Sequence, residues 1–384
     1  MSPTRNDAPA SATRWMRRAV AGANPVELVL ASTRLYSSLP VIGKRLEPFA
    51  GLTALALWGG HYAPATLQAA VGRRTAQLSN RAAAELERNG VRKVPPFAKA
   101  RAQRRAFLHR DSIRYGDDAA QVLDVWRLPE LPPGPAPVLL FVPGGAWVQG
   151  TRVMQGHTLL AHLVRRGWVC LTMDYRVSPR HRWPRQIADV NAAIAWARAN
   201  AAEYGGDSDF LAIAGCSAGG HLAALAGLTP GDPAFRGELA EDADTTVDAV
   251  VGIYGRYDWE DRSTPTRRNF QDFLERVVVR RSQSRHPEIY RAASPLARIH
   301  EGAPPFFLIH GEKDTLIPVG EARNFHEALS AVSRETVRYS EIPWAGHAFD
   351  LVDGAHARRC AEETTAFLTD VRDRHLAART STAV

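Results

Sequence analysis

The sequence predicts an α/β protein with a mostly parallel central sheet and helices on both faces. Two observations lead to this prediction. From Ser112 onward, short apolar runs of strand type alternate with longer helical stretches, which is typical of a parallel sheet with crossover helices. The composition, with 45% hydrophobic and 23% charged residues over 384 positions, is that of a globular protein with an extensive core.

The charge is unevenly distributed along the chain. Residues 1–114 carry a net charge of +13 and the remainder carries −5, for a total of +8. We therefore divide the chain into a basic helical segment, residues 1–110, and an α/β body, residues 111–384. No sustained apolar core follows Arg17 and Arg18, so a cleavable signal peptide is not expected. The basic charge favours attraction to an anionic surface, for which membrane headgroups are the best candidate.

The N-terminal segment contains one long uncharged stretch, Pro48–Gly72. Its apolar part, Phe49–Gly60, is about half the ~20 residues that a membrane span requires. Three interpretations remain open: a helix packed over the body as a cap, a helix on a membrane surface, or a span. Basic pairs flank the stretch and suit a helix at the membrane surface. A nucleic-acid surface is disfavoured, because only Phe97 and Phe107 lie near the basic residues of Arg81–Arg114.

The body is expected to begin with a hairpin over residues 113–128, turning at Gly116-Asp117-Asp118. Short apolar runs bounded by turn residues then predict strands at Val138–Val142, Val169–Met173, Phe210–Ala214, Val247–Tyr254, Phe306–Ile309 and Val337–Ile342. Longer stretches between them predict helices at Gln155–Arg166, Gln186–Glu203, the residues leading to Leu225, Val319–Val332 and Ala355–Asp373. Arg256–Pro287 is charged and irregular.

The strongest chemical signal is the stretch FLAIAGCSAGGHLAAL, Phe210–Leu225. A strand, a tight glycine turn and a helix form the context in which G-x-S-x-G acts as a nucleophile elbow. Glycine is needed at Gly215 and Gly219, because a side chain there would collide with the neighbouring strand or helix. The pattern predicts Ser217 as a nucleophile, and a purely structural glycine turn is the alternative.

A serine hydroxyl needs a base to take its proton and an acid group to orient that base. Asp314 follows the predicted strand Phe306–Ile309, and His347 follows the strand Val337–Ile342. Both therefore lie where a strand gives way to a loop, and the order Ser217, Asp314, His347 matches one of the known orders of such triads.

Other residues could fill the same roles. The rival acids are Glu312 and Asp350, and we expect both to face solvent. The rival bases are His310, at the end of a strand, and His356 and His375, in or beside the last helix.

The third requirement is a set of backbone N–H groups for the oxyanion of the tetrahedral intermediate. Ala218, directly after the nucleophile, is expected to supply one. The loop after Val138–Val142 reads PGGAW, Pro143 to Trp147, and its glycines let the main chain pass close to a substrate. Trp147 is expected to wall the pocket. A simple glycine turn is again the alternative.

Residues 112–376 resemble the hormone-sensitive-lipase-like branch of the α/β-hydrolase fold, which includes carboxylesterases and the arylformamidase group. The matching segments are PGGAW, MDYRVSPRHRWP, GCSAGGHLAAL, SPLARI, HGEKD and GHAF. The resemblance implies a catalytic domain over residues 111–384. It also implies a triad of Ser217, Asp314 and His347, oxyanion amides from Gly145, Ala146 and Ala218, and substrate contacts from Gly144 and Trp147.

The chain departs from the pattern of this family at two positions. Pro143 stands where the family loop usually begins with a supporting histidine, and Cys216 stands where the residue before the nucleophile is commonly acidic. We expect Cys216 to be a small buried residue pointing away from the substrate. Asp174, Tyr175 and Arg176 are expected to have structural roles.

The predicted function is hydrolysis of carboxylic esters, with a small molecule as substrate, through an acyl-enzyme, without a metal or organic cofactor and without nucleic acid as a partner. The alternatives are an amidase of the arylformamidase type and a ligand-binding protein on the same fold. The N-terminal segment and part of Arg256–Pro287 are expected to cap the site. Cys170, Cys216 and Cys360 are too few and too scattered for a disulfide framework, which suits reduced thiols in the cytoplasm. Contact with membranes is expected from the basic N-terminal segment. The oligomeric state is left open.

Overall fold

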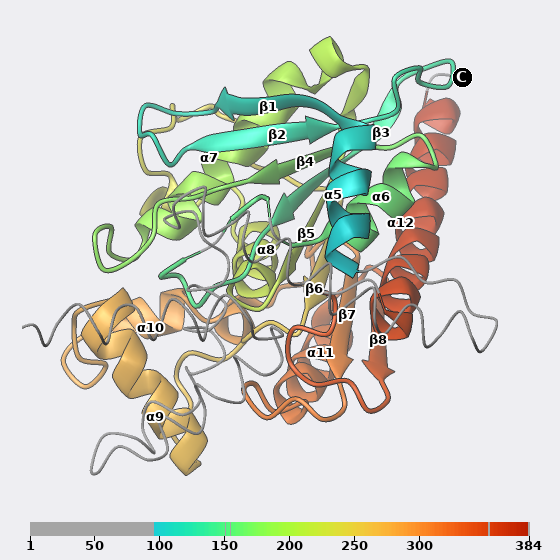
Figure 1. Cartoon of the computed structure of the whole chain (residues 1–384). Helices are drawn as coiled ribbons and strands as arrows, with labels where there is room; N and C mark the ends of the chain where they lie inside the picture. The colour runs from blue at the N-terminus through green and yellow to red at the C-terminus, as the bar shows by residue number, and fades with distance from the viewer. Residues whose placement is uncertain (1–95, 150, 154, 352–353, 383–384) are drawn as a thin grey trace, which may run out of the picture. The chain divides into compact units, whose positions relative to one another are not determined.

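The computed structural model describes residues 96–149, 151–153, 155–351 and 354–382. Its centre is an eight-stranded sheet in the order β1-β2-β4-β3-β5-β6-β7-β8 (Figure 1). Strand β2 is antiparallel to β1 and β4, and every pair from β4 to β8 is parallel. The predicted α/β fold class is confirmed.

The strands are β1 (Leu108–Arg114), β2 (Val122–Trp126), β3 (Ala136–Val142), β4 (Val169–Met173), β5 (Gly206–Cys216), β6 (Ala249–Ile253), β7 (Phe306–Gly311) and β8 (Val337–Ile342). The α-helices are α5 (Pro96–Phe107), α6 (His157–Val164), α7 (Arg185–Asn200), α8 (Ala218–Leu228), α9 (Pro265–Phe273), α10 (Pro287–Ala292), α11 (Gly320–Val332) and α12 (Ala355–Thr382). Short turns of other helix types lie at Ala201–Tyr204, Pro233–Phe235, Leu274–Val278 and Pro295–Arg298.

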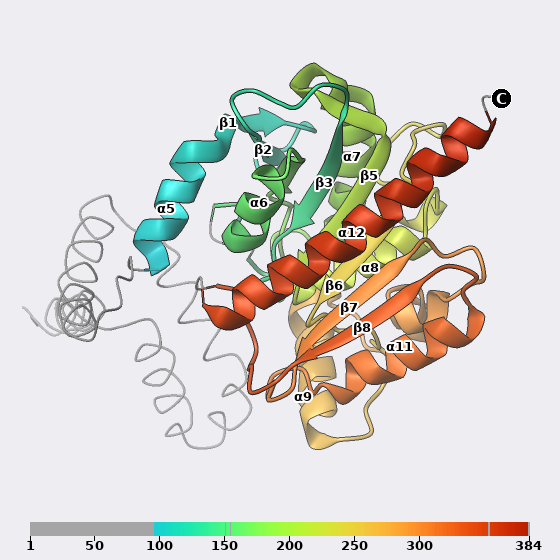
Figure 2. The same ribbon diagram turned by 90° about the vertical axis from the view of Figure 1, so that its right-hand side faces the viewer.

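Helices cover both faces of the sheet. Helices α6 and α12 lie on one face, and α7, α8 and α11 lie on the other (Figure 2). On the first face, Leu160 and Phe367 from the helices join Phe141 and Ile309 from the strands in one apolar cluster. Strands β3, β4, β6 and β7 are buried along their whole length, because they are covered on both faces, and this explains their continuous apolar sequences.

The carboxyl ends of the parallel strands meet at one edge of the sheet. There Val142 pairs with Gly215, and Gly311 pairs with Ile342. The loops that follow β3, β5, β7 and β8 therefore start from neighbouring positions, although they are far apart in the sequence. In an open α/β sheet this edge is where ligands bind.

Several predicted boundaries differ from the structure. The hairpin begins at Leu108, three residues before the predicted start of the body at residue 111, and α12 continues to Thr382. The stretch predicted as irregular contains α9 and a π-helical turn, Leu274–Val278. Of the N-terminal segment, residues 1–95 lie outside the described residues, so its helices and its role as a cap remain predictions. Within the part of the chain that the structure describes, no helix is long and apolar enough to cross a membrane.

Candidate active site

Ser217 lies between the end of β5 and the first residue of α8. Its backbone has φ 55° and ψ −119°, a conformation that costs a non-glycine residue about 1–3 kcal/mol. The Ser217 amide donates to the carbonyl of Ile253 at 2.9 Å, which ties the turn to β6. A Cβ on Gly215 would overlap the Gly219 carbonyl oxygen, and a Cβ on Gly219 would overlap the Val142 carbonyl oxygen. The two glycines therefore allow the elbow to form.

The three residues predicted as a triad are brought together. Nε2 of His347 lies 3.0 Å from Oγ of Ser217, and Nδ1 of His347 lies 2.7 Å from Oδ2 of Asp314. The other oxygen of Asp314, Oδ1, accepts the amides of Leu316 and Ile317 at 2.9 Å each. The carboxylate is thus held in place, and it faces the imidazole with its remaining oxygen.

His310 is part of the support of this carboxylate. Its side chain is fully buried, and its Nε2 lies 2.8 Å from the Ile317 carbonyl and 3.3 Å from Oδ2 of Asp314. Because a carbonyl can only accept, Nε2 must carry the proton. Burial would raise the pKa of Asp314, but His347 and His310 together hold this pKa well below its usual range. Asp314 therefore stays ionised beside His347.

The rival acids have other partners. Asp350 was expected to face solvent, and this expectation is wrong: the side chain is buried and accepts a hydrogen bond from the Tyr254 hydroxyl. Burial raises the pKa of Asp350. The Glu312 carboxylate accepts from Lys313 at 2.8 Å and from the Trp344 amide at 3.1 Å. Neither acid bonds to His347.

The rival bases also lie elsewhere. His310 contacts Asp314 and not Ser217, as described above. His375 lies in α12 and packs against Phe210, with its Nδ1 3.9 Å from Asp248. His356 also lies in α12, one residue from its start. His347 is the histidine that meets Ser217 in the described part of the chain.

Tyr254 forms the wall behind His347, and the sequence analysis missed it. Its ring centroid is 4.7 Å from that of His347, and its φ of 40° is unusual for a residue with a side chain. The hydroxyl is fixed by Asp350, so the ring can hold the imidazole from one side. Only the position of Tyr254 at the end of a predicted strand could have suggested this role.

The loop after β3 turns sharply beside the serine. Gly145, Ala146 and Trp147 have φ values of 140°, 51° and 58°, a run of left-handed conformations. The amides of Gly145, Ala146 and Ala218 have no acceptor among the described residues. Such amides are the donors that an oxyanion requires. The amides of the three predicted oxyanion residues are thus unused within the described part of the chain.

The two residues predicted to contact substrate differ in their placement. Gly144 lies against the elbow, where an added Cβ would be 2.9 Å from Cβ of Ser217. Its amide, however, donates to the side chain of Gln155 at 2.6 Å, so that group is already occupied. Trp147 is 1% exposed and packs edge to face on Trp259, at 4.8 Å between ring centroids.

Trp147 also defines the state of a buried histidine. Its Nε1–H donates to Nδ1 of His221 at 3.3 Å, and Nε2 of His221 lies 2.7 Å from the Ala293 carbonyl. Indole can only donate, so His221 is neutral with its proton on Nε2. Burial accordingly lowers the pKa of His221 to about 3. His221 is a structural residue of the wall next to the elbow.

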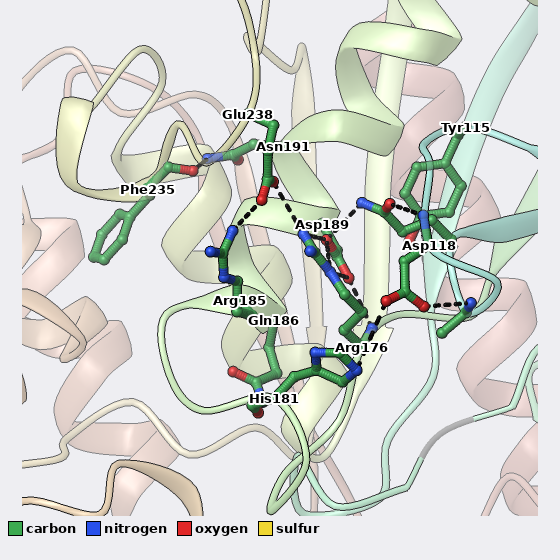
Figure 3. Close-up of polar contacts among 12 residues, drawn as sticks. Tyr115, Asp118, Arg176, His181, Arg185, Gln186, Asp189, Asn191, Phe235 and Glu238 are labelled. Atoms are coloured by element: carbon green, nitrogen blue, oxygen red, sulfur yellow. Dashed lines mark hydrogen bonds and ion pairs between the residues drawn. The ribbon is translucent and has the colours of Figure 1, made fainter.

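The three residues after β4 make polar contacts with neighbouring parts of the chain. Arg176 lies between Asp189 and Glu238 and pairs with both (Figure 3). Asp174 pairs with Arg152, and the Tyr175 hydroxyl donates to the Pro143 carbonyl at 3.1 Å. Tyr175 therefore acts on the loop that carries the oxyanion amides. Among the described residues, no group of histidine, cysteine and acidic side chains is arranged to hold a metal ion.

An elbow serine paired with a histidine that is itself oriented by an acid, on this sheet, is the arrangement of a serine hydrolase of the α/β-hydrolase class. The BD-FAE family model matches residues 123–329, and the chain belongs to this family. It falls within the hormone-sensitive-lipase-like group, as its sequence motifs predicted. The protein is a carboxylic ester hydrolase.

Individual relatives agree with this assignment. The chain is 51% identical to "Esterase LipC" of Mycobacterium tuberculosis over 93% of both chains. It is 41% identical to "Probable carboxylic ester hydrolase LipM" of the same organism, over 90% of this chain and 81% of that one. An esterase from Thermogutta terrifontis, solved with butyrate bound, has the same fold, with a TM-score of 0.58, 24% identity and coverage of 68% of this chain and 94% of that one.

Proposed function

We propose that Ser217, His347 and Asp314 are the catalytic triad of this esterase. The observation that carries the proposal is the double hydrogen bond of His347, at 2.7 Å to Asp314 and 3.0 Å to Ser217. The carboxylate accepts the Nδ1–H of the imidazole. Nε2 is then unprotonated and faces the serine hydroxyl, which is the tautomer that a general base needs.

In the first half of the reaction, Nε2 of His347 takes the proton of Ser217 as Oγ attacks the ester carbonyl carbon. The carbonyl oxygen becomes an oxyanion, and the amides of Gly145, Ala146 and Ala218 stabilise it. The C–O bond to the alcohol then breaks, and the alcohol leaves with the proton from His347. The product of this half-reaction is an acyl ester on Ser217.

In the second half, His347 takes a proton from water, which attacks the acyl carbon. The same amides stabilise the second oxyanion. Collapse of this intermediate returns the proton to Oγ of Ser217 and releases the carboxylic acid. The proposed substrates are small-molecule carboxylic esters, and an amide matched to the best ester measures the amidase alternative.

A fluorophosphonate probe tests the assignment of the nucleophile, because it labels an activated serine without presupposing the substrate. The wild-type chain should be labelled and should hydrolyse a p-nitrophenyl ester. Ser217→Ala should abolish the labelling and lower kcat by about 10⁴-fold or more. Retention of more than a hundredth of the activity by this variant would show that another residue is the nucleophile.

We further propose that residues 1–110 form a cap and a membrane-contact segment, and that residues 111–384 form the catalytic domain. The support is the charge of +13 on residues 1–114 and the uncharged stretch Pro48–Gly72 between basic pairs. Several basic residues near an anionic leaflet, at about 1 kcal/mol each, are sufficient for useful affinity. The three free cysteines support a cytoplasmic enzyme, and the basic charge supports its contact with membranes.

A further inference from the structure

The loop that carries the oxyanion amides lacks its usual support in this chain. Pro143 has neither an N–H nor a polar side chain, and Cys216 has no carboxylate to offer the neighbouring loop. The loop nevertheless has positive φ at Gly145, Ala146 and Trp147, and this conformation is strained for the two residues that are not glycine. Contacts from outside the loop must therefore hold it, and the Tyr175 hydroxyl supplies one of them at the Pro143 carbonyl.

The side chain of Gln155 makes further contacts, with both the loop and the elbow. Its Oε1 lies 2.6 Å from the amide nitrogen of Gly144 and 2.8 Å from Sγ of Cys216, and its Nε2 lies 3.4 Å from the Gly144 carbonyl oxygen. The residue is 7% exposed, so water competes little for these groups. Gln155 thus touches both the oxyanion loop and the residue before the nucleophile.

The chemistry of the partners defines the orientation of this amide. The Gly144 N–H can only donate, so the atom 2.6 Å away must be the oxygen of Gln155. Since that oxygen can only accept, Cys216 must donate its S–H. Cys216 is therefore a protonated thiol, and burial accordingly raises its pKa. The same orientation leaves the Gln155 NH₂ facing the Gly144 carbonyl.

The contact with the Gly144 carbonyl has a direct consequence for catalysis. The C=O of Gly144 and the N–H of Gly145 belong to one peptide unit, which is planar and trans, so the two groups point in opposite directions. When Gln155 holds the carbonyl on its own side, the Gly145 N–H is aimed away from Gln155. Gly145 is the first of the proposed oxyanion donors.

Gln155 is itself held by its surroundings. Arg152, three residues earlier, is buried and bonds to Asp124 at 2.7 Å and to Asp174. These acids lie on β2 and directly after β4, so the segment that carries Gln155 is fastened to the sheet. Gln155 therefore lies on a segment that ion pairs hold to the central sheet.

We propose that Gln155 is a positioning residue, which locks the oxyanion loop to the nucleophile elbow by bonding both polar groups of Gly144 and the thiol of Cys216. This proposal rests on the proposed function of Ser217 and of the oxyanion amides. Gln155 does not touch the reacting atoms. It takes the place of the histidine and the acidic residue that this chain lacks at positions 143 and 216.

The test compares Gln155→Met, which keeps the length of the side chain but removes its acceptor and donor, with Gln155→Glu, which keeps an acceptor for both donors. The substrate is p-nitrophenyl acetate. A fluorophosphonate titrates the active sites, and kcat is calculated per titrated site. Gln155→Met should lower kcat by about 10- to 100-fold with KM changed less than about 3-fold, because a displaced amide weakens oxyanion binding and not substrate binding. Gln155→Glu keeps an acceptor for the Gly144 N–H and the Cys216 thiol but loses the donor to the Gly144 carbonyl, so its kcat should lie between that of wild type and that of Gln155→Met.

Cys216→Ala removes the second donor, and its effect should not add to that of Gln155→Met, because the two residues act through one contact. Gln121→Met is the matched control. Gln121 is equally buried and bonds to Asp189 and Asp118, away from the oxyanion loop. The melting temperature of Gln121→Met should fall by about as much as that of Gln155→Met, while its kcat should stay at the wild-type value.

Two results would overturn the proposal: a wild-type kcat per titrated site in Gln155→Met, or a loss of kcat that Gln155→Glu does not reduce. Either result can be distinguished from a failure of the proposed function by the activity of Ser217→Ala. If Ser217→Ala, measured in the same series, remained active, the nucleophile assignment would be wrong. If Ser217→Ala is inactive while Gln155→Met matches wild type, only the positioning role is wrong.

Discussion

Replacing Asp314 by asparagine changes one atom of the carboxylate and should abolish most of the activity. The structure indicates how the new amide would be oriented. Oδ1 of Asp314 accepts two backbone amides, from Leu316 and Ile317, and this oxygen cannot become an NH₂ group without losing both bonds. Each such bond contributes about 1 kcal/mol net, and the facing donors would also be left unsatisfied.

The oxygen of the asparagine should therefore occupy the Oδ1 position, by a margin of about 2 kcal/mol or more. Its NH₂ group then faces His347 at the position that Oδ2 now holds, 2.7 Å from Nδ1. An NH₂ group donates, so Nδ1 must accept and the imidazole proton must move to Nε2. In this tautomer Nε2 no longer takes the proton of Ser217, and an equivalent change in a known triad lowers kcat by about 10⁴-fold.

The assay measures kcat on a p-nitrophenyl ester for Asp314→Asn, Asp350→Asn and Glu312→Gln, with circular dichroism to confirm folding. We expect the 10⁴-fold loss at position 314 alone. Asp350→Asn should stay within about 10-fold of wild type, because Asp350 contacts Tyr254 and not His347. An equal loss at 350, or a loss of less than 10-fold at 314, would refute the reasoning.

Three further outcomes are expected. Gly219→Ala should destabilise the protein by about 1–3 kcal/mol or more, seen in urea unfolding, because its Cβ would overlap the Val142 carbonyl oxygen; Gly320→Ala, where a Cβ meets open space, is the control and should cost nothing. Burial, with a smaller contribution from Arg104, lowers the pKa of His157 to about 4, so the unfolded chain binds a proton that the folded chain does not. About 3 kcal/mol of stability should therefore be lost as the pH falls from about 6.5 to 4, and His157→Leu should flatten this slope; an unchanged slope would contradict the assignment. The full chain should co-sediment with anionic vesicles at low salt and less at high salt, whereas a chain starting at Ala106 should not bind; equal binding by both would remove the N-terminal segment from the explanation.

The sequence was sufficient to predict the fold class and the three residues that meet at the site. Each of these residues directly follows or closely follows a predicted strand, and parallel strands bring their carboxyl ends to one edge. Ser217 also has a local pattern, because a tight strand-to-helix turn requires glycine at fixed positions. Strand ends and the glycine pattern can both be recognised within a few residues of sequence.

The supporting residues could not be predicted in the same way. Gln155 acts on Gly144 and Cys216, and Tyr254 meets Asp350 across 96 positions of sequence. Such contacts depend on how loops from different strands pack, and no spacing rule encodes them. For the same reason Asp350 was expected in solvent, since nothing near it in the sequence indicates a buried partner.

His310 was considered as a base, and the structure gives a physical reason why it does not act as one. A base must have an unprotonated nitrogen directed at the nucleophile, but the Ile317 carbonyl keeps the proton of His310 on Nε2. That N–H is directed at Asp314, which also receives the N–H of His347. One carboxylate thus lies between two imidazoles, and only His347 has its second nitrogen within reach of Ser217. The direction of each ring, set by a single backbone carbonyl or carboxylate, decides which histidine can accept the serine proton.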